Sequence, residues 1–179
     1  NSDRPGNLWT QEENLIVALS KNFICIFDNA TSLPTDASDT LCKSITGGRF
    51  KKRARYTDGD VHNTDLMTTW IITGISNPGK HPDFMSRIFI IDTAIIEGSD
   101  RKTDEELKKL ADKYRPGLQA LIFDCISEGL RNRDSVRQSK PKLHRLADAN
   151  LYSLAMAKKL DLSHEAISEL WNVNKELQE

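Results

Sequence analysis

The chain lacks a long hydrophobic run and an apolar leader. No apolar run exceeds five residues, and Phe23–Phe27 is one of that length. A membrane-spanning helix needs roughly 20 such residues, so no membrane association is expected. The first residues, Asn1–Gly6, are polar and contain no apolar core of a signal peptide. A cytoplasmic location is therefore expected.

Cysteine is scarce and histidine is scattered. The three cysteines are an odd number, lie far apart and fall in apolar patterns: Cys25, Cys42 and Cys125. This pattern predicts buried free thiols rather than disulfides. The four histidines have no ligand-like spacing to one another or to the cysteines, so no metal centre of that kind is predicted.

The chain also has no large excess of positive or negative charge, since its net charge is -1. A globally basic nucleic-acid-binding protein is thereby excluded, but two local basic segments remain. The first contains Arg49, Lys51, Lys52, Arg53 and Arg55. The second contains Arg131, Arg133, Arg137, Lys140, Lys142 and Arg145. Each segment is either a nucleic-acid contact or an ordinary solvated loop.

The first half of the chain has an α/β pattern. Three short apolar stretches predict strands buried on both faces, as in a parallel sheet: Phe23–Phe27, Thr69–Ile75 and Ile88–Ile91. A brief helix capped by Asp36 or Ser38 is predicted between the first two and ends at Gly47. The first basic segment and the turn signal after it predict a hairpin or an exposed loop.

The second half has helical periodicity. Thr103–Glu106 forms a capping-box sequence, Pro116 is predicted to begin a second and longer helix, and Ser163 caps the last one. Two domains follow from this change of period. Residues 1–98 form the α/β part and residues 99–179 a helical subdomain.

Polar residues at the ends of the predicted strands are the candidates for binding and hydrolysing a nucleotide. Asp28 ends the first strand, where nucleotide hydrolases hold Mg²⁺ by a carboxylate, although many strands end in a turn-forming aspartate. Thr73 and Asn77 flank the end of the second strand, where a sensor orients water. Arg87 precedes the third strand and is either an arginine finger for phosphoryl transfer or a salt-bridge partner.

Short motifs follow one another in a characteristic order: Ile24–Asn29, Ser38–Cys42, Thr46–Gly48, Arg55–Asp58, Thr73–Ile75, Pro82–Arg87 and Leu146–Asp148. Over nearly its whole length the chain resembles the primase/helicase-like ATP-binding proteins of phages and mobile elements. The segment Ser86–Phe89 is more distantly similar to the arginine-finger segment of minichromosome-maintenance-type AAA+ helicases.

This resemblance implies a fold and a cofactor. The implied fold class is α/β, with the C-terminal part of an AAA+ or P-loop ATPase sheet followed by an all-helical subdomain. The cofactor would be Mg-ATP, and the partners would be nucleic acid, most simply DNA, and further copies of the chain in a ring.

The resemblance also implies roles for single residues. Asp28 would be the Walker B aspartate that holds Mg²⁺ through the nucleotide, and Arg87 the finger. Thr73 or Asn77 would be sensor 1. The first basic segment would be an insertion hairpin that faces DNA.

Two features depart from that family pattern. Asn29 stands where such ATPases have a glutamate, and an amide cannot act as a general base. No GxxxxGK[ST] phosphate-binding loop occurs within residues 1–179. Two functions therefore remain open. The chain is either part of an ATP-dependent, helicase-like motor or a nucleic-acid-binding or regulatory module on a degenerate ATPase scaffold.

Overall fold

The computed structural model describes residues 12–53, 61–77 and 79–178, with the backbone alone for 51–53, 61 and 62. The chain divides into two compact units after Ile88. The sequence placed this boundary between residues 98 and 99, at the end of the irregular segment that follows Ile88.

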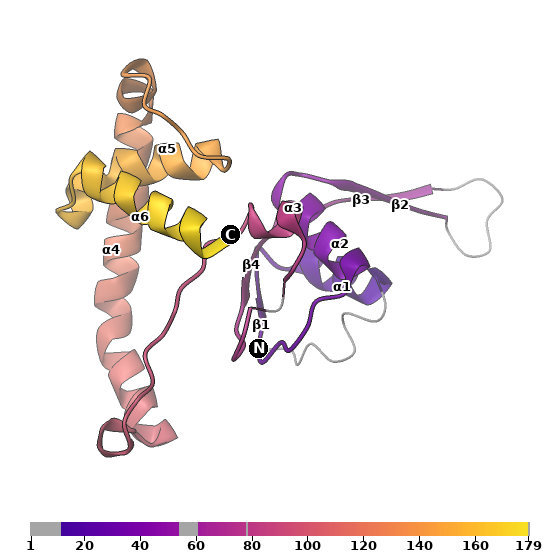
Figure 1. Ribbon diagram of the computed structural model, residues 1–179, viewed down its shortest axis with the longest axis horizontal. Helices are drawn as coiled ribbons and strands as arrows, with labels where there is room; N and C mark the ends of the chain where they lie inside the picture. The colour runs from indigo at the N-terminus through magenta and orange to yellow at the C-terminus, as the bar shows by residue number, and fades with distance from the viewer. Residues whose placement is uncertain (1–11, 54–60, 78, 179) are drawn as a thin grey trace. The chain divides into compact units, whose positions relative to one another are not determined.

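Helices and short strands alternate in the first unit, and helices make up most of the second (Figure 1). The elements of the first unit are α1 (Glu12–Lys21), β1 (Ile24–Phe27), α2 (Thr35–Ile45), β2 (Arg49–Arg53), β3 (Val61–Asp65), β4 (Thr69–Ile72) and α3 (Pro82–Met85). Those of the second are the 3-10 turn η2 (Gly98–Asp100), α4 (Asp104–Gln138), α5 (Ala147–Met156), the 3-10 turn η3 (Ala157–Leu160) and α6 (His164–Gln178).

Strands β1 and β4 form a parallel pair, with Phe27 opposite Ile72. Helices α1 and α2 lie against one face of this pair, where Cys25 and Phe27 are buried (Figure 1). The opposite face carries Ile24 and Ile26, which are about half exposed. The predicted strands therefore exist, but the prediction that both their faces are buried is wrong for the described residues. A stretch that is apolar on both faces does not reveal which face is covered.

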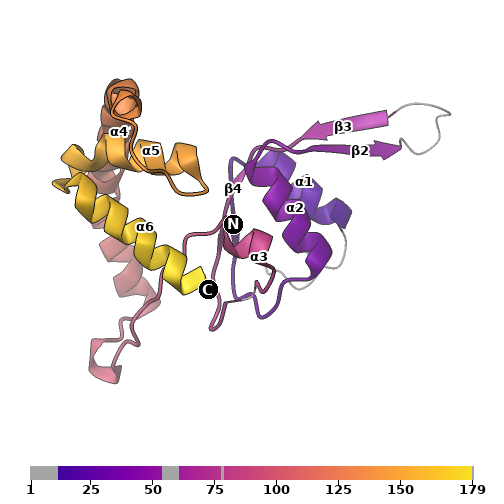
Figure 2. The same ribbon diagram turned by 45° about the horizontal axis from the view of Figure 1, so that its top comes forward.

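Strands β2 and β3 pair with each other in an antiparallel hairpin, with Arg49 opposite Asp65. The predicted hairpin is thereby confirmed. It extends away from α1 and α2 as a ribbon of its own (Figure 2) and does not join the β1–β4 pair.

The predicted third strand is wrong, because Ile88–Ile91 has no strand pairing and Ile91 is largely exposed. The backbone N–H of Ile90 donates instead to the side-chain Oδ1 of Asn174, at 2.7 Å. Asn174 is buried on α6. Its side-chain oxygen therefore provides the hydrogen-bond acceptor that a neighbouring strand would otherwise supply.

Helix α2 ends as predicted and begins earlier than predicted. Gly47 follows it with a φ of 80°, a left-handed conformation that glycine adopts without a steric penalty. Its N-cap is Pro34, with no side-chain cap, and Ser38 lies buried inside the helix. The predicted cap at Asp36 or Ser38 is therefore wrong, because both residues are already helical.

Helix α4 confirms the predicted capping box and corrects the predicted break. The N–H of Glu106 donates to Thr103 Oγ1 at 3.3 Å, and the N–H of Thr103 donates to Glu106 Oε2 at 2.7 Å. Pro116 does not begin a new helix, because α4 runs through it to Gln138. A proline in a helix removes one backbone hydrogen bond, which is an energetic cost and not an absolute stop.

The core of the second unit lies where α5 and α6 meet the C-terminal half of α4. Its buried residues are Val136, Leu151, Leu154, Ala155, Ala157 and Ile167, with Trp171 packed beside them. The predicted Ser163 cap is confirmed, since its Oγ accepts the N–H of Ala166 at 3.1 Å.

All three cysteines are buried and free, as predicted. Among the residues that the structure describes, no helix is long and apolar enough to cross a membrane. The larger ATPase sheet that the resemblance implies stays a prediction.

Candidate functional site

Asp28 and Thr73 meet at the carboxyl ends of two paired parallel strands. Phe27 and Ile72 are the last partners in the β1–β4 register, so the next residue of each strand emerges at the same edge. The Thr73 hydroxyl donates to Asp28 Oδ1 at 2.5 Å. Two residues that were singled out in the sequence are thus brought into direct contact.

Thr73 connects the end of β4 to the end of β1 and the loop after it through four hydrogen bonds. Besides donating to Asp28, its Oγ1 accepts the N–H of Asn29 at 3.0 Å. Its carbonyl accepts the N–H of Ala30 at 2.8 Å, and its own N–H donates to the carbonyl of Phe27 at 3.0 Å. Asn29 has a φ of 58°, the left-handed conformation that asparagine tolerates better than most residues. The loop after β1 is therefore held in one conformation beside β4.

The Asp28 carboxylate is exposed at this edge. An exposed carboxylate on a fixed strand end suits an oxygen-seeking cation such as Mg²⁺, which keeps several waters and takes further ligands from phosphates. Across residues 12–53, 61–77 and 79–178, no group of three or more His, Cys, Asp or Glu residues is placed to hold a metal. A cation here would therefore take its remaining ligands from water and a bound phosphate.

Asn77 contacts residues of the loop and helix that follow it and does not contact Asp28 at the strand edge. Its Nδ2 lies 3.3 Å from Met85 Sδ, and its Oδ1 accepts the N–H of Gly79 at 3.1 Å. A Cβ at Gly79 would lie 2.3 Å from the ring of Phe84, so this loop needs glycine. Of the two sensor candidates, only Thr73 contacts Asp28 in the described chain.

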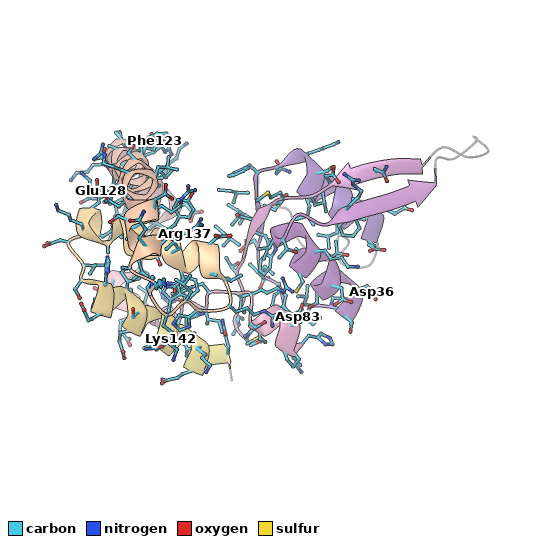
Figure 3. All side chains as sticks on the ribbon, turned by 90° about the horizontal axis from the view of Figure 1, so that it is seen from above. Asp36, Asp83, Phe123, Glu128, Arg137 and Lys142 are labelled. Atoms are coloured by element: carbon cyan, nitrogen blue, oxygen red, sulfur yellow. The ribbon has the colours of Figure 1, made fainter. Side chains whose placement is uncertain are left out.

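Arg87 is engaged by Asp83 on α3, the helix where Figure 3 marks that aspartate. Its Nε donates to Asp83 Oδ2 at 3.1 Å, and its Nη2 donates to Asp83 Oδ1 at 3.2 Å. No hydrogen bond or ion pair joins Arg87 to Asp28 among the described residues. An arginine finger at this position would first have to exchange its bidentate partner for a phosphate.

The thiol of Cys42 lies beside this ion pair. Burial, together with the neighbouring Asp83 carboxylate, raises its pKa to about 11, while Arg87 acts in the opposite direction. Cys42 is therefore a protonated, inert thiol at neutral pH and not a nucleophile.

The basic hairpin carries an uneven charge. In strands β2 and β3 the single acid is Asp65, and it accepts from Arg49 Nε at 2.6 Å. The register places Lys51, Lys52 and Arg53 opposite residues 63, 62 and 61, none of which is acidic. Arg55 lies outside the described residues. Three cations of one strand therefore face no acid across the hairpin, which favours an anionic partner.

The second basic segment is partly neutralised from within. Arg131 forms an ion pair with Glu128, and Arg133 donates to Tyr152 Oη at 3.0 Å and pairs with Asp134. These contacts favour a structural role for Arg131 and Arg133 over a role in binding nucleic acid.

The sequence offered Arg87 as a salt-bridge partner without naming Asp83, and it missed a second contact that shapes the site. Asp83 stands four residues before Arg87, an i,i+4 spacing that would have signalled the ion pair. The stacking of Trp70 on Phe84, at 5.3 Å between ring centroids, joins β4 to α3 and has no local signal.

A family model described as actinomycete integrative conjugative element replication protein matches residues 6–164. No curated protein and no solved structure matches the chain. The match covers both units and includes the strand edge, the hairpin and most of the helical unit.

Proposed function

Because the chain belongs to the replication proteins of actinomycete integrative conjugative elements, we propose that it binds DNA through the β2–β3 hairpin during replication of such an element. The family links the chain to mobile-element replication and hence to DNA. One observation supports the hairpin as the DNA-binding surface. Lys51, Lys52 and Arg53 lie on a projecting strand, with no acid opposite them in the register.

Cations on a two-stranded ribbon suit the phosphate backbone. Each cation that neutralises a phosphate releases a condensed counterion, so binding weakens steeply with salt and depends little on sequence. The other candidate segment has an acid among its cations and two of its arginines already engaged. The hairpin is therefore the better contact.

The test replaces Lys51, Lys52 and Arg53 by alanine and measures duplex affinity across a salt series. Three lost phosphate contacts reduce the slope of log K against log salt by up to ~2.7. The matched control replaces Arg137, Lys140 and Lys142, which removes the same charge from the second segment. An unchanged slope in the first variant, or an equal loss in the control, would refute the proposal.

A second candidate function rests on the Asp28–Thr73 bond. We infer that this strand edge is half of a Mg-nucleotide site in an ATP-driven replication assembly, with Asp28 facing the cation and Thr73 orienting Asp28 or a water. The bond supports this role because a fixed, exposed carboxylate beside a hydroxyl is what such a half-site requires. Arg87 would act on the nucleotide of a neighbouring copy.

The nucleotide proposal is tested by titrating the chain with ATP in the presence and absence of Mg²⁺. Binding that strengthens with Mg²⁺, and loses that dependence in Asp28→Asn, is expected. Asp36→Asn, an exposed aspartate in the first turn of α2, is the control and keeps it. Mg²⁺ dependence that survives in Asp28→Asn would rule out this carboxylate.

A further inference from the structure

Helix α4 carries one apolar face along most of its length, and only part of that face is covered. At about 100° per residue, Leu107, Leu118 and Cys125 fall on the same side of the helix as Gly129 and Val136. The buried residues of α4 are Cys125, Gly129 and Val136, all in its C-terminal half. There α5 and η3 pack on it: a Cβ added at Gly129 would lie 3.4 Å from the Tyr152 ring of α5, and Lys159 of η3 pairs with Asp124.

Within the second unit, the same face continues uncovered through the N-terminal half. Figure 1 shows this half of α4 running on beyond α5 and α6. Its large apolar side chains are each about 40 to 60% exposed: Leu107, Tyr114, Leu118, Leu121 and Ile122. Together they expose several hundred Å², on the order of the ~300–600 Å² patch that marks a functional surface on a monomer.

The spacing of this face is that of a coiled-coil seam. Leu107, Ala111, Tyr114, Leu118, Leu121 and Cys125 follow one another in steps of four and three residues. A strict alternation of four and three has a mean of 3.5, the period at which two helices keep one seam in contact. Pro116 lies on the opposite side of the helix, about 180° from Cys125, so it leaves the seam intact.

We propose that this seam, Leu107–Cys125, binds the same seam of a second copy of the chain in an antiparallel pair of α4 helices. A two-fold pair needs a surface that is complementary to itself, and one continuous stripe of apolar residues about 27 Å long meets that need. The proposal is independent of the DNA and nucleotide proposals.

The position of α5 decides the direction of pairing. It occupies the same face of α4 from Cys125 onward, so two parallel helices would bring both α5 helices into one space. In an antiparallel pair, only the uncovered halves overlap and each α5 lies beyond the end of the other copy's α4. The small Ala111 then faces the large Leu121 of the second copy, as close packing of a seam requires.

Charge favours the same arrangement. The first turn of α4 is acidic, with Asp104, Glu105 and Glu106. Antiparallel pairing brings it to the second copy's Cys125 region, where η3 presents the exposed Lys158. Lys159 and Glu128 in that region are already paired, with Asp124 and Arg131. The acidic first turn thus meets Lys158 at both ends of the seam, which favours the antiparallel orientation.

The first experiment measures the mass of the whole chain in solution by light scattering or sedimentation. A dimer is expected, and Leu118→Glu is expected to be monomeric with an unchanged helical circular dichroism spectrum. Phe123→Glu is the matched control. Phe123 is 68% exposed against 57% for Leu118, and it lies on the side of α4 away from α5 (Figure 3). This control stays dimeric.

The second experiment tests orientation by cross-linking. In a Cys125→Ala background, Ala111→Cys with Leu121→Cys on one chain is expected to give a covalent dimer on oxidation, whereas Leu107→Cys alone gives none. A chain that is monomeric throughout, or one whose dimer is lost in Ile26→Glu and kept in Leu118→Glu, would overturn the proposal. Cross-linking of Leu107→Cys alone would overturn the antiparallel direction.

Discussion

The two units differ in how fully they cover their own apolar faces. In the first unit, α1 and α2 bury their apolar residues almost completely, with Leu15 and Leu41 inaccessible to solvent. In the second unit, α4 buries three of its 35 residues, and a longer apolar stripe remains exposed. An amphipathic pattern therefore shows which face of a helix is to be covered. It does not show whether the same unit supplies the cover.

The largest effect is expected for Leu41→Ala. Leu41 is fully buried between the helices and the strand pair, so its truncation leaves a cavity and is expected to lower the free energy of unfolding by about 2–5 kcal/mol. Phe123→Ala, on an exposed part of α4, should change it by less than ~0.5 kcal/mol. Urea unfolding measures both. Equal losses would remove the contrast between the two units.

Alkaline pH should weaken the first unit through Cys42. The folded state holds the thiol proton up to a pKa of about 11, whereas the unfolded thiol loses it near its ordinary value of 9.0. The stabilising contribution is therefore complete below pH 9.0 and is lost as the pH rises through about 11. Urea midpoints for the wild type and Cys42→Ala should show a steeper alkaline decline in the wild type. Parallel declines would contradict the raised pKa.

The capping box of α4 gives a smaller and opposite pH effect in the second unit. Thr103→Ala removes the side-chain cap and is expected to cost about 1 kcal/mol. Hydrogen bonds from the Thr103 backbone N–H and, to a smaller extent, from its hydroxyl lower the pKa of Glu106. The contribution of the hydroxyl to the carboxylate is therefore present above about pH 4.5 and is lost as the pH falls. Thermal unfolding at neutral and acidic pH should show the difference between variant and wild type shrinking in acid. A difference that stays constant would mean that the carboxylate does not contribute.

The smallest effect is expected for Asp65→Ala at the base of the hairpin. The Arg49–Asp65 ion pair is well exposed, and such pairs contribute about 0–1 kcal/mol. The variant should fold normally but bind DNA slightly more tightly, because it frees one more cation of β2. Weaker DNA binding would contradict the proposed role of the hairpin.

Local signals predicted most single elements. The capping box at Thr103, the cap at Ser163, the end of α2 at Gly47 and the basic hairpin all follow from patterns within a few residues. The predicted third strand failed because a distant partner decides. The apolar run at Ile88–Ile91 has strand composition, but the partner of Ile90 is an asparagine on α6. A local pattern cannot contain that contact.

The site shows the same division. The sequence placed Asp28 and Thr73 at strand ends, and the parallel register brought them into contact. The sequence also singled out Asn77 and Arg87. It did not predict that Asn77 contacts Met85 or that Arg87 pairs with Asp83. Whether these residues serve a nucleotide stays a prediction.

The sequence by itself determined the periods, the caps at Thr103 and Ser163, the buried thiols and the places where charge gathers, because these depend on neighbours along the chain. Tertiary structure alone decided which face of β1 and β4 is covered, that α4 passes through Pro116 and that half of its apolar stripe is left bare. These outcomes depend on the total of contacts made across the fold. A proline's local cost or a strand's intrinsic preference is a few kcal/mol at most, and packing by distant segments outweighs it.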